Sequence, residues 1–184
     1  MIEVVVSIAI YTLVLGALYV AFSSFYRQQG VDIEMTKQTQ SANYLLDTLG
    51  RELREANRAE NGSFVLSVAS ASALTFYSDV DDDDKMEKVI YALADTDLVK
   101  TVIEPGADNA YAGAGASKTV VGNVQNATVF KYYDKDFTGA GSDMTAPINV
   151  LDVRTIGIFL DLDSGSKMTS YALHFETKIN LRNI

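Results

Sequence analysis

The acidic run Asp79-Val80-Asp81-Asp82-Asp83-Asp84-Lys85-Met86-Glu87 is the densest group of side chains in this sequence that could bind an ion. Oxygen ligands at alternating positions, from Asp79, Asp81 and Asp83, with Glu87 close behind, suit a hard cation such as calcium, which takes six to eight oxygens. The EF-hand pattern is not met, because its glycine is absent and the closing glutamate comes too early. Six acids this close together repel, which favours either a bound cation or a solvated hairpin tip. Both hypotheses, calcium coordination by these four carboxylates and a solvated tip, follow from the sequence.

The sequence contains no comparable pattern for catalysis. The single histidine, His174, lies between Leu173 and Phe175 in a strand-like alternation, which favours a structural role. Nucleophile-elbow and metal-binding histidine-pair motifs are absent. The lack of cysteine excludes disulfides and thiolate chemistry, and a net charge of −9 opposes a general nucleic-acid surface. We therefore expect no enzymatic activity, no nucleic-acid partner, and no cofactor apart from the calcium ion considered above.

The first 26 residues are the element around which the chain is organised. Glu3 is followed by an uncharged apolar run from Val4 to Tyr26, which ends at Arg27. This run exceeds the ~20 residues that a helix needs to cross a ~30 Å hydrocarbon core, and soluble core helices are rarely apolar on every side over such a length. The segment therefore lies in lipid or among equally apolar helices. Because it lacks the form of a cleaved secretory signal, we expect it to stay on the protein.

The charges around this span conflict with the type of domain that follows it. Arg27 and Lys37 both come after the span, so the positive-inside rule would place the C-terminal part in the cytoplasm. The C-terminal part instead has the β-rich pattern of an extracytoplasmic domain. A short basic leader, removed before Met1, would reconcile the two observations.

Residues 27–60 continue the helix in amphipathic form. Apolar residues recur at steps of three and four, the signature of one buried face, and are Met35, Ala42, Leu45, Leu46, Leu49, Leu53 and Ala56. Charged residues, Glu52 among them, fill the other sides, and we expect them to face solvent. No proline precedes Pro105, so the helix can run nearly unbroken to Arg58, over ~85 Å at ~1.5 Å per residue. Asn61-Gly62 is then predicted to end it.

Residues 61–184 form a β-rich head domain, because the apolar period changes from 3.6 to 2 and turn residues separate the runs. Strands are expected near residues 64–68, 73–78, 88–93, 98–103, 120–124, 128–133, 155–162 and 170–179. The second and third of these bracket the acidic run and predict a hairpin. Residues 106–117 and 139–147 are expected to be surface loops. One long helix followed by about eight antiparallel strands predicts an α+β fold, in which a sheet wraps across the apolar helix face.

The N-terminal sequence Met1-Ile2-Glu3-Val4-Val5-Val6-Ser7-Ile8-Ala9-Ile10 resembles the start of a mature type IV pilin or type II secretion pseudopilin. That family has a basic leader cut by a prepilin peptidase, a methylated first residue and a characteristic glutamate at the fifth mature position, whereas the glutamate is third here. The C-terminal disulfide of many relatives is also absent. Four further segments are similar to W-type minor pilins and J-type pseudopilins, namely residues 45–54, 74–79, 87–91 and 180–183.

The resemblance implies a pilin, or a minor pilin or pseudopilin, that waits as a single-pass protein in the cytoplasmic (inner) membrane. It would then polymerise through its N-terminal helix with identical or related subunits into an extracellular filament, aided by pilus assembly machinery. Glu3 would pair with a neighbour's α-amino group and set the subunit register; alternatively, Glu3 lies in the headgroup zone near the positive end of the helix dipole. Family members lose helicity locally on assembly, which makes Gly16 the expected weak point. The alternative function is a single-pass anchor for a ligand- or partner-binding domain that does not polymerise.

Overall fold

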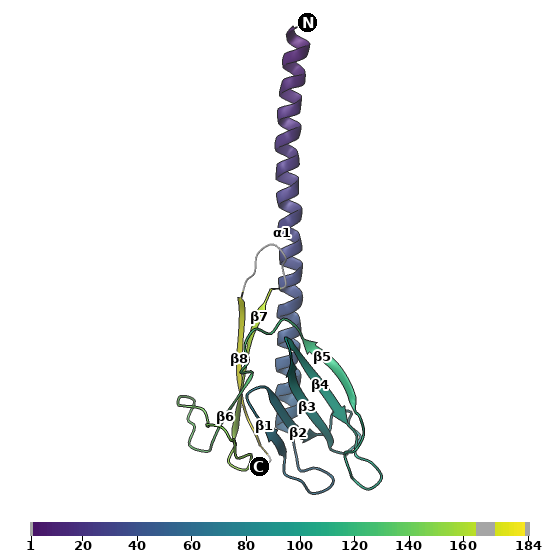
Figure 1. The fold of residues 1–184 in the computed structure, drawn as a ribbon, viewed down its shortest axis with the longest axis vertical. Helices are drawn as coiled ribbons and strands as arrows, with labels where there is room; N and C mark the ends of the chain where they lie inside the picture. Colours follow the sequence, from purple (N-terminus) through teal and green to yellow (C-terminus); the bar gives the residue numbers. More distant parts are fainter. Residues whose placement is uncertain (1, 165–171, 183–184) are drawn as a thin grey trace.

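The computed structural model describes residues 2–164 and 172–182, with the side chains of residues 27–32 left out, and shows one long helix followed by antiparallel strands (Figure 1). The fold is α+β, as predicted. The helix is α1 (Ile2–Glu55), and the strands are β1 (Leu66–Ala69), β2 (Ala73–Ser78), β3 (Glu87–Ala94), β4 (Asp97–Ile103), β5 (Ala116–Val121), β6 (Phe130–Tyr133), β7 (Thr155–Asp163) and β8 (Ala172–Asn180).

Helix α1 is continuous over 54 residues, a length of ~80 Å at ~1.5 Å per residue. It ends at Glu55, so the prediction that it continues to Arg58 and stops at Asn61-Gly62 is wrong. The backbone leaves the helix early because Asn57 N donates to Tyr77 O at 3.0 Å, which ties the chain to the end of β2. Gly62, at a φ of 81°, instead forms a separate turn in which its N–H donates to Ala59 O.

The strands form two sheets, which corrects the prediction of a single one. One sheet has the order β1-β2-β3-β4-β5 and the other β6-β7-β8, with every pairing antiparallel. After β5 the chain turns through Asn123, at a φ of 60°, and crosses to the second sheet. There an isolated bridge joins Val124 to Leu162, and Gln125 N donates to Asp161 O at 2.7 Å. The turn therefore ends pairing with β4 and carries the chain into the second sheet, which also contacts the first where Phe130 N donates to Ala71 O at 3.0 Å.

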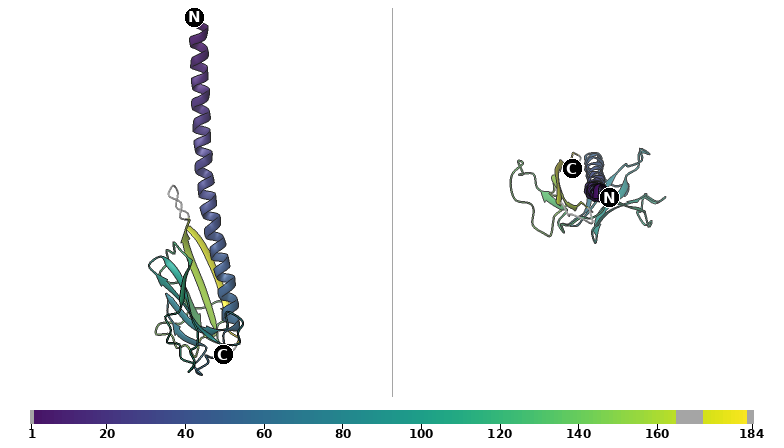
Figure 2. Two further views of the ribbon diagram at one scale, coloured as in Figure 1. Left: turned by 90° about the vertical axis from the view of Figure 1, so that its right-hand side faces the viewer. Right: turned by 90° about the horizontal axis from the view of Figure 1, so that it is seen from above.

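The C-terminal half of α1 packs against both sheets, which diverge on either side of it when viewed along the helix (Figure 2). The predicted apolar face is confirmed, since its central residues are at most 2% exposed: Ala42, Leu45, Leu49, Leu53 and Ala56. Buried side chains of both sheets complete the core, among them Phe76 and Tyr91 from the first sheet and Ile156 and Ile158 from the second. The helix therefore serves as the third layer of the domain.

The N-terminal half of α1 projects beyond the domain, away from both sheets (Figure 1). Among the described residues, Ile2–Tyr26 is the one helical segment long and apolar enough to cross a membrane, with a mean hydropathy of 2.3 and none of its most apolar window buried. The helix passes through Gly16 without a break, and a Cβ added there would meet no atom within 4 Å. Local unwinding at Gly16 concerns an assembled state and stays a prediction.

Candidate functional site

The acidic run lies in the turn between β2 and β3, as predicted. These strands pair from Ala73↔Ala92 to Ser78↔Glu87, so the last ladder pair fixes both ends of the turn. Within the turn, Asp82 and Asp84 have φ values of 61° and 64°. Aspartate is one of the few side chains that adopt this left-handed conformation readily, which explains how an Asp-rich sequence closes the turn without glycine.

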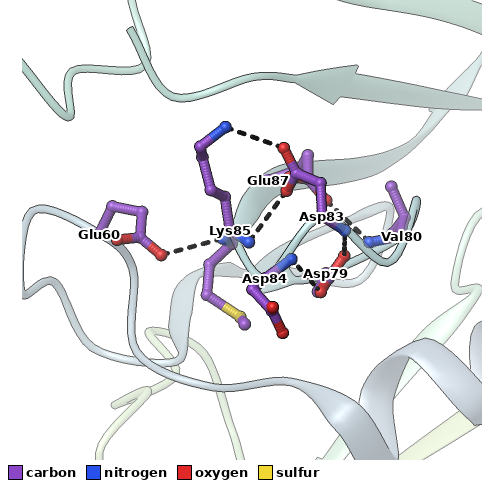
Figure 3. Close-up of polar contacts among 8 residues, drawn as sticks. Glu60, Asp79, Val80, Asp83, Asp84, Lys85 and Glu87 are labelled. Carbon is purple, nitrogen blue, oxygen red and sulfur yellow. Dashed lines mark hydrogen bonds and ion pairs between the residues drawn. The ribbon is translucent and has the colours of Figure 1, made fainter. Parts of the chain in front are cut away.

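Hydrogen bonds within the turn hold two of its carboxylates in place (Figure 3). Asp79 Oδ1 accepts from Asp83 N at 3.2 Å, and Asp79 Oδ2 accepts from Asp84 N at 3.0 Å. Asp83 Oδ1 accepts from Lys85 N at 2.9 Å, while its Oδ2 forms an ion pair with Lys85 Nζ at 2.9 Å. The hydrogen bond from the Lys85 side chain lowers the pKa of Asp83. Asp83 therefore stays ionised at neutral pH, and the hydrogen bonds orient both carboxylates.

Glu87 differs from the other acids of the turn because it is fully buried, at 0% exposure. Its Oε2 accepts from Val80 N at 2.7 Å, whereas its Oε1 is buried without a hydrogen-bond partner in the described part of the chain. Burial raises the pKa of Glu87 to about 7; the Val80 N–H opposes this shift, and the charges of Glu104 and Asp81 add to it.

The four acids predicted to act together are brought together by the fold. Asp79, Asp81, Asp83 and Glu87 each present an oxygen within 4.8 Å of the others. Asp82 and Asp84, in the same turn, do not belong to this group. The fold therefore brings the four predicted side chains together, while their role as calcium ligands stays a prediction.

Glu52 is a second buried acid, and the prediction that it faces solvent is wrong. It is 3% exposed, and its Oε2 accepts from Tyr91 Oη at 2.8 Å while its Oε1 accepts from Lys100 Nζ at 2.5 Å. Burial, together with the charge of Glu52, raises the pKa of Tyr91. The sequence did hold a signal for this site, because Glu52 lies three residues after Leu49 and four before Ala56, on the apolar face.

The other residues singled out from sequence lie apart from this turn. Glu3 is exposed in the first turn of α1, and its proposed pairing with a neighbouring subunit stays a prediction. His174 lies in β8, where its Nδ1 is 2.5 Å from Oδ1 of its cross-strand partner Asp161. The predicted strand position of His174 is thus confirmed.

Comparison with known proteins gives similarity in structure and none in sequence. The sequence matches no protein-family model and no curated relative. Among solved structures, the chain is similar to one in the crystal structure of the GspK-GspI-GspJ complex from the enterotoxigenic Escherichia coli type 2 secretion system, with 14% identity and a TM-score of 0.49. The match covers 80% of this chain and 99% of that one. Similarity at this level assigns no function, so the functional argument rests on this chain's own residues.

Proposed function

We propose that this chain is a structural subunit that polymerises through its N-terminal helix into an extracellular filament of the type IV pilus kind. The observation that carries the proposal is the uncovered apolar helix. Its large apolar side chains, from Ile2 to Tyr26, are between 48% and 79% exposed. Apolar surface on this scale is rare on a soluble monomer and marks a surface that another apolar phase covers.

A bilayer and a bundle of identical helices both supply that apolar phase. The segment Ile2–Tyr26 is long enough for one membrane crossing, which suits a subunit held in the membrane before assembly. A bundle of identical helices offers apolar contacts equivalent to those of lipid and adds close packing between side chains. Contacts between different faces of successive subunits generate a fibre when the rotation from one subunit to the next does not close a ring.

The apolar helical segment Ile2–Tyr26, here called the rod, joins the domain without a break, and this junction supports assembly over simple anchoring. Helix α1 runs from Ile2 to Glu55 without interruption, and its last turns are fixed in the core by Leu49 and Leu53. An anchor needs only a flexible tether, whereas a continuous helix transmits the position of the rod directly to the domain. The family resemblance of residues 1–10 adds Glu3 as the group that sets the axial position of each rod.

Electron microscopy of material sheared from cells that make the protein, with mass spectrometry of its first residues, tests this proposal. We expect filaments from the parent chain and from Glu34→Gln, a control that removes another exposed acid of α1. Glu3→Gln should abolish them, because the carboxylate would no longer pair with a neighbour's amino group. Monomers or dimers in detergent, no sheared filaments and indifference to Glu3→Gln would instead favour the single-pass anchor of a binding domain, which the one membrane-length helix also fits.

A further inference from the structure

We propose that the β2–β3 turn is a calcium site in which Asp79, Asp81, Asp83 and Glu87 provide the protein ligands. The four carboxylates each place an oxygen within 4.8 Å of the others. Calcium binds oxygen at about 2.3–2.6 Å, so ligands on opposite sides of one ion lie about 5 Å apart. The four oxygens are therefore close enough to share one coordination sphere.

The buried carboxylate of Glu87 points to a ligand independently of the acidic cluster. Burying a carboxylate is unfavourable unless its oxygens are paired. Only Oε2 has such a pairing, with Val80 N, while Oε1 is buried and unpartnered in the described residues. Asp81 and Asp83 are exposed at the rim of the turn. An ion would thus enter from solvent between the exposed acids and be closed from below by Glu87.

The donor set and the backbone favour calcium over other metals. All four ligands are carboxylates, and hard cations prefer oxygen, whereas zinc and copper select nitrogen or sulfur. Magnesium needs near-ideal octahedral geometry at about 2.0–2.1 Å and keeps several waters, while calcium accepts irregular geometry. The backbone of this turn is irregular, since Asp82 and Asp84 have left-handed conformations, and an irregular turn suits the coordination of calcium better than that of magnesium.

The ion pair between Lys85 and Asp83 does not block this site. Both side chains are exposed, at 59% and 37%, and water screens an exposed ion pair, so this pair adds little to stability. Asp83 Oδ1 meanwhile accepts from Lys85 N, which leaves this oxygen a second lone pair. Calcium can therefore displace the lysine side chain while the backbone of the turn keeps its shape.

The turn is bonded to the end of α1, so an ion bound there stabilises more than a loop. Ser78 Oγ donates to Glu52 O at 3.1 Å, and Met86 N donates to Glu60 Oε1 at 3.1 Å. Tyr111 Oη also donates to Met86 O at 2.6 Å, and the Tyr111 ring lies 5.1 Å from that of Tyr77. An ion that binds only the folded state raises the free energy of unfolding by RT ln(1 + c/Kd), where c is the ion concentration, so the unfolding temperature rises with the logarithm of c once the ion exceeds Kd.

Calcium titration of the chelator-treated full chain in detergent tests the site, with near-UV circular dichroism reporting unfolding and calorimetry reporting affinity. The melting temperature should rise with calcium, and bound terbium should luminesce through excitation of Tyr77 and Tyr111. Asp81→Asn should weaken binding by ~10-fold or more, the size of effect expected when metal-site groups are lost. The matched control is Asp82→Asn, which removes the same charge from the same turn but outside the cluster, at a φ of 61° that asparagine tolerates.

Glu87→Gln keeps the side chain's size and its acceptor for Val80 N, so it should fold and lose the calcium response. Three results would overturn the proposal: no calcium-dependent stabilisation of the parent chain, equal weakening by Asp81→Asn and Asp82→Asn, or equal affinity for magnesium. The first two would make the turn a solvated acidic tip. None of these measurements requires filaments, so the outcome does not depend on the proposed assembly function.

Discussion

Replacing Glu52 with alanine should destabilise the domain strongly, although Glu52 belongs to a charged segment of a helix. Its carboxylate is the partner of two groups that lie beneath the first sheet, the Tyr91 hydroxyl and the Lys100 ammonium. Removing it leaves a buried hydroxyl unsatisfied and a cation largely enclosed, with 17% of the Lys100 side chain exposed.

The expected magnitude follows from that burial. Truncating one partner of a buried ion pair costs about 3–5 kcal/mol, because the other charge stays buried and unpaired. The partial exposure of Lys100 lets its flexible stem carry the ammonium toward water, so we expect a value near the lower limit, about 3 kcal/mol. For a chain of this size, the melting temperature should fall by roughly 6–12 °C, at about 2–4 °C per kcal/mol.

Urea unfolding of the full chain in detergent, followed by tyrosine near-UV circular dichroism, measures this difference. Glu55→Ala is the matched control, since Glu55 is an exposed acid three residues away, and its effect should stay within about 0.5 kcal/mol. The double variant Glu52→Leu/Lys100→Met should recover most of the loss, because apolar replacements of a buried pair are often neutral. A loss below about 1 kcal/mol for Glu52→Ala would refute the buried pair.

Two further predictions concern the acidic turn and the glycines. In chelator, the pKa of Glu87 is about 7 in the folded state against an ordinary 4.5. Its contribution to the free energy of unfolding is therefore complete below about pH 4.5 and is lost as the pH rises through about 7. Glu87→Gln should flatten this part of the pH profile measured by urea unfolding, and an unchanged profile would contradict the prediction. Gly50→Ala should stabilise the domain by up to about 1 kcal/mol, because the new Cβ makes ordinary contacts at 3.6 Å within a helix. Gly115→Ala should instead destabilise it, since φ is +72° and the Cβ would lie 2.7 Å from Val102 O. Thermal melting compares both variants with the parent chain, and equal effects would refute the distinction.

The elements of the fold were largely predictable because their patterns are local. The apolar stripe of α1 and the alternation of the strands both depend on residues a few positions apart. Strand β5 shows where this fails. It begins at Ala116 and not near residue 120, since Ala116 and Ser117 pair with Val102 and Thr101 although their side chains are exposed and small. Backbone pairing without an apolar face leaves no alternation to detect.

In the candidate site, too, features that depend on neighbouring residues were predictable from sequence, and features that depend on distant residues were not. The spacing of the acids selected the four clustered carboxylates, because a short turn brings them together wherever the hairpin lies. The burial of Glu87 was not predictable, since it depends on a cross-strand pairing with buried Ser78 and on Glu52 O, to which Ser78 donates. Glu52 shows a second limit, because its charge predicts exposure to solvent whereas its position on the apolar face of α1 places it in the core.

The distance between the two proposed sites determines how their roles can be related. The acidic turn is bonded to the end of α1 through Ser78 and Glu52, and Glu3 lies ~75 Å away along the helix at ~1.5 Å per residue. Screening over about 8–10 Å at physiological salt prevents direct electrostatic coupling over such a distance. A cation in the turn would therefore act on the stability of the domain, while Glu3 would act on the packing of the apolar helices in the proposed filament. A Glu3 variant should accordingly keep its full calcium response. An Asp81 variant should keep the contacts that its apolar helix makes with neighbouring subunits in the proposed filament.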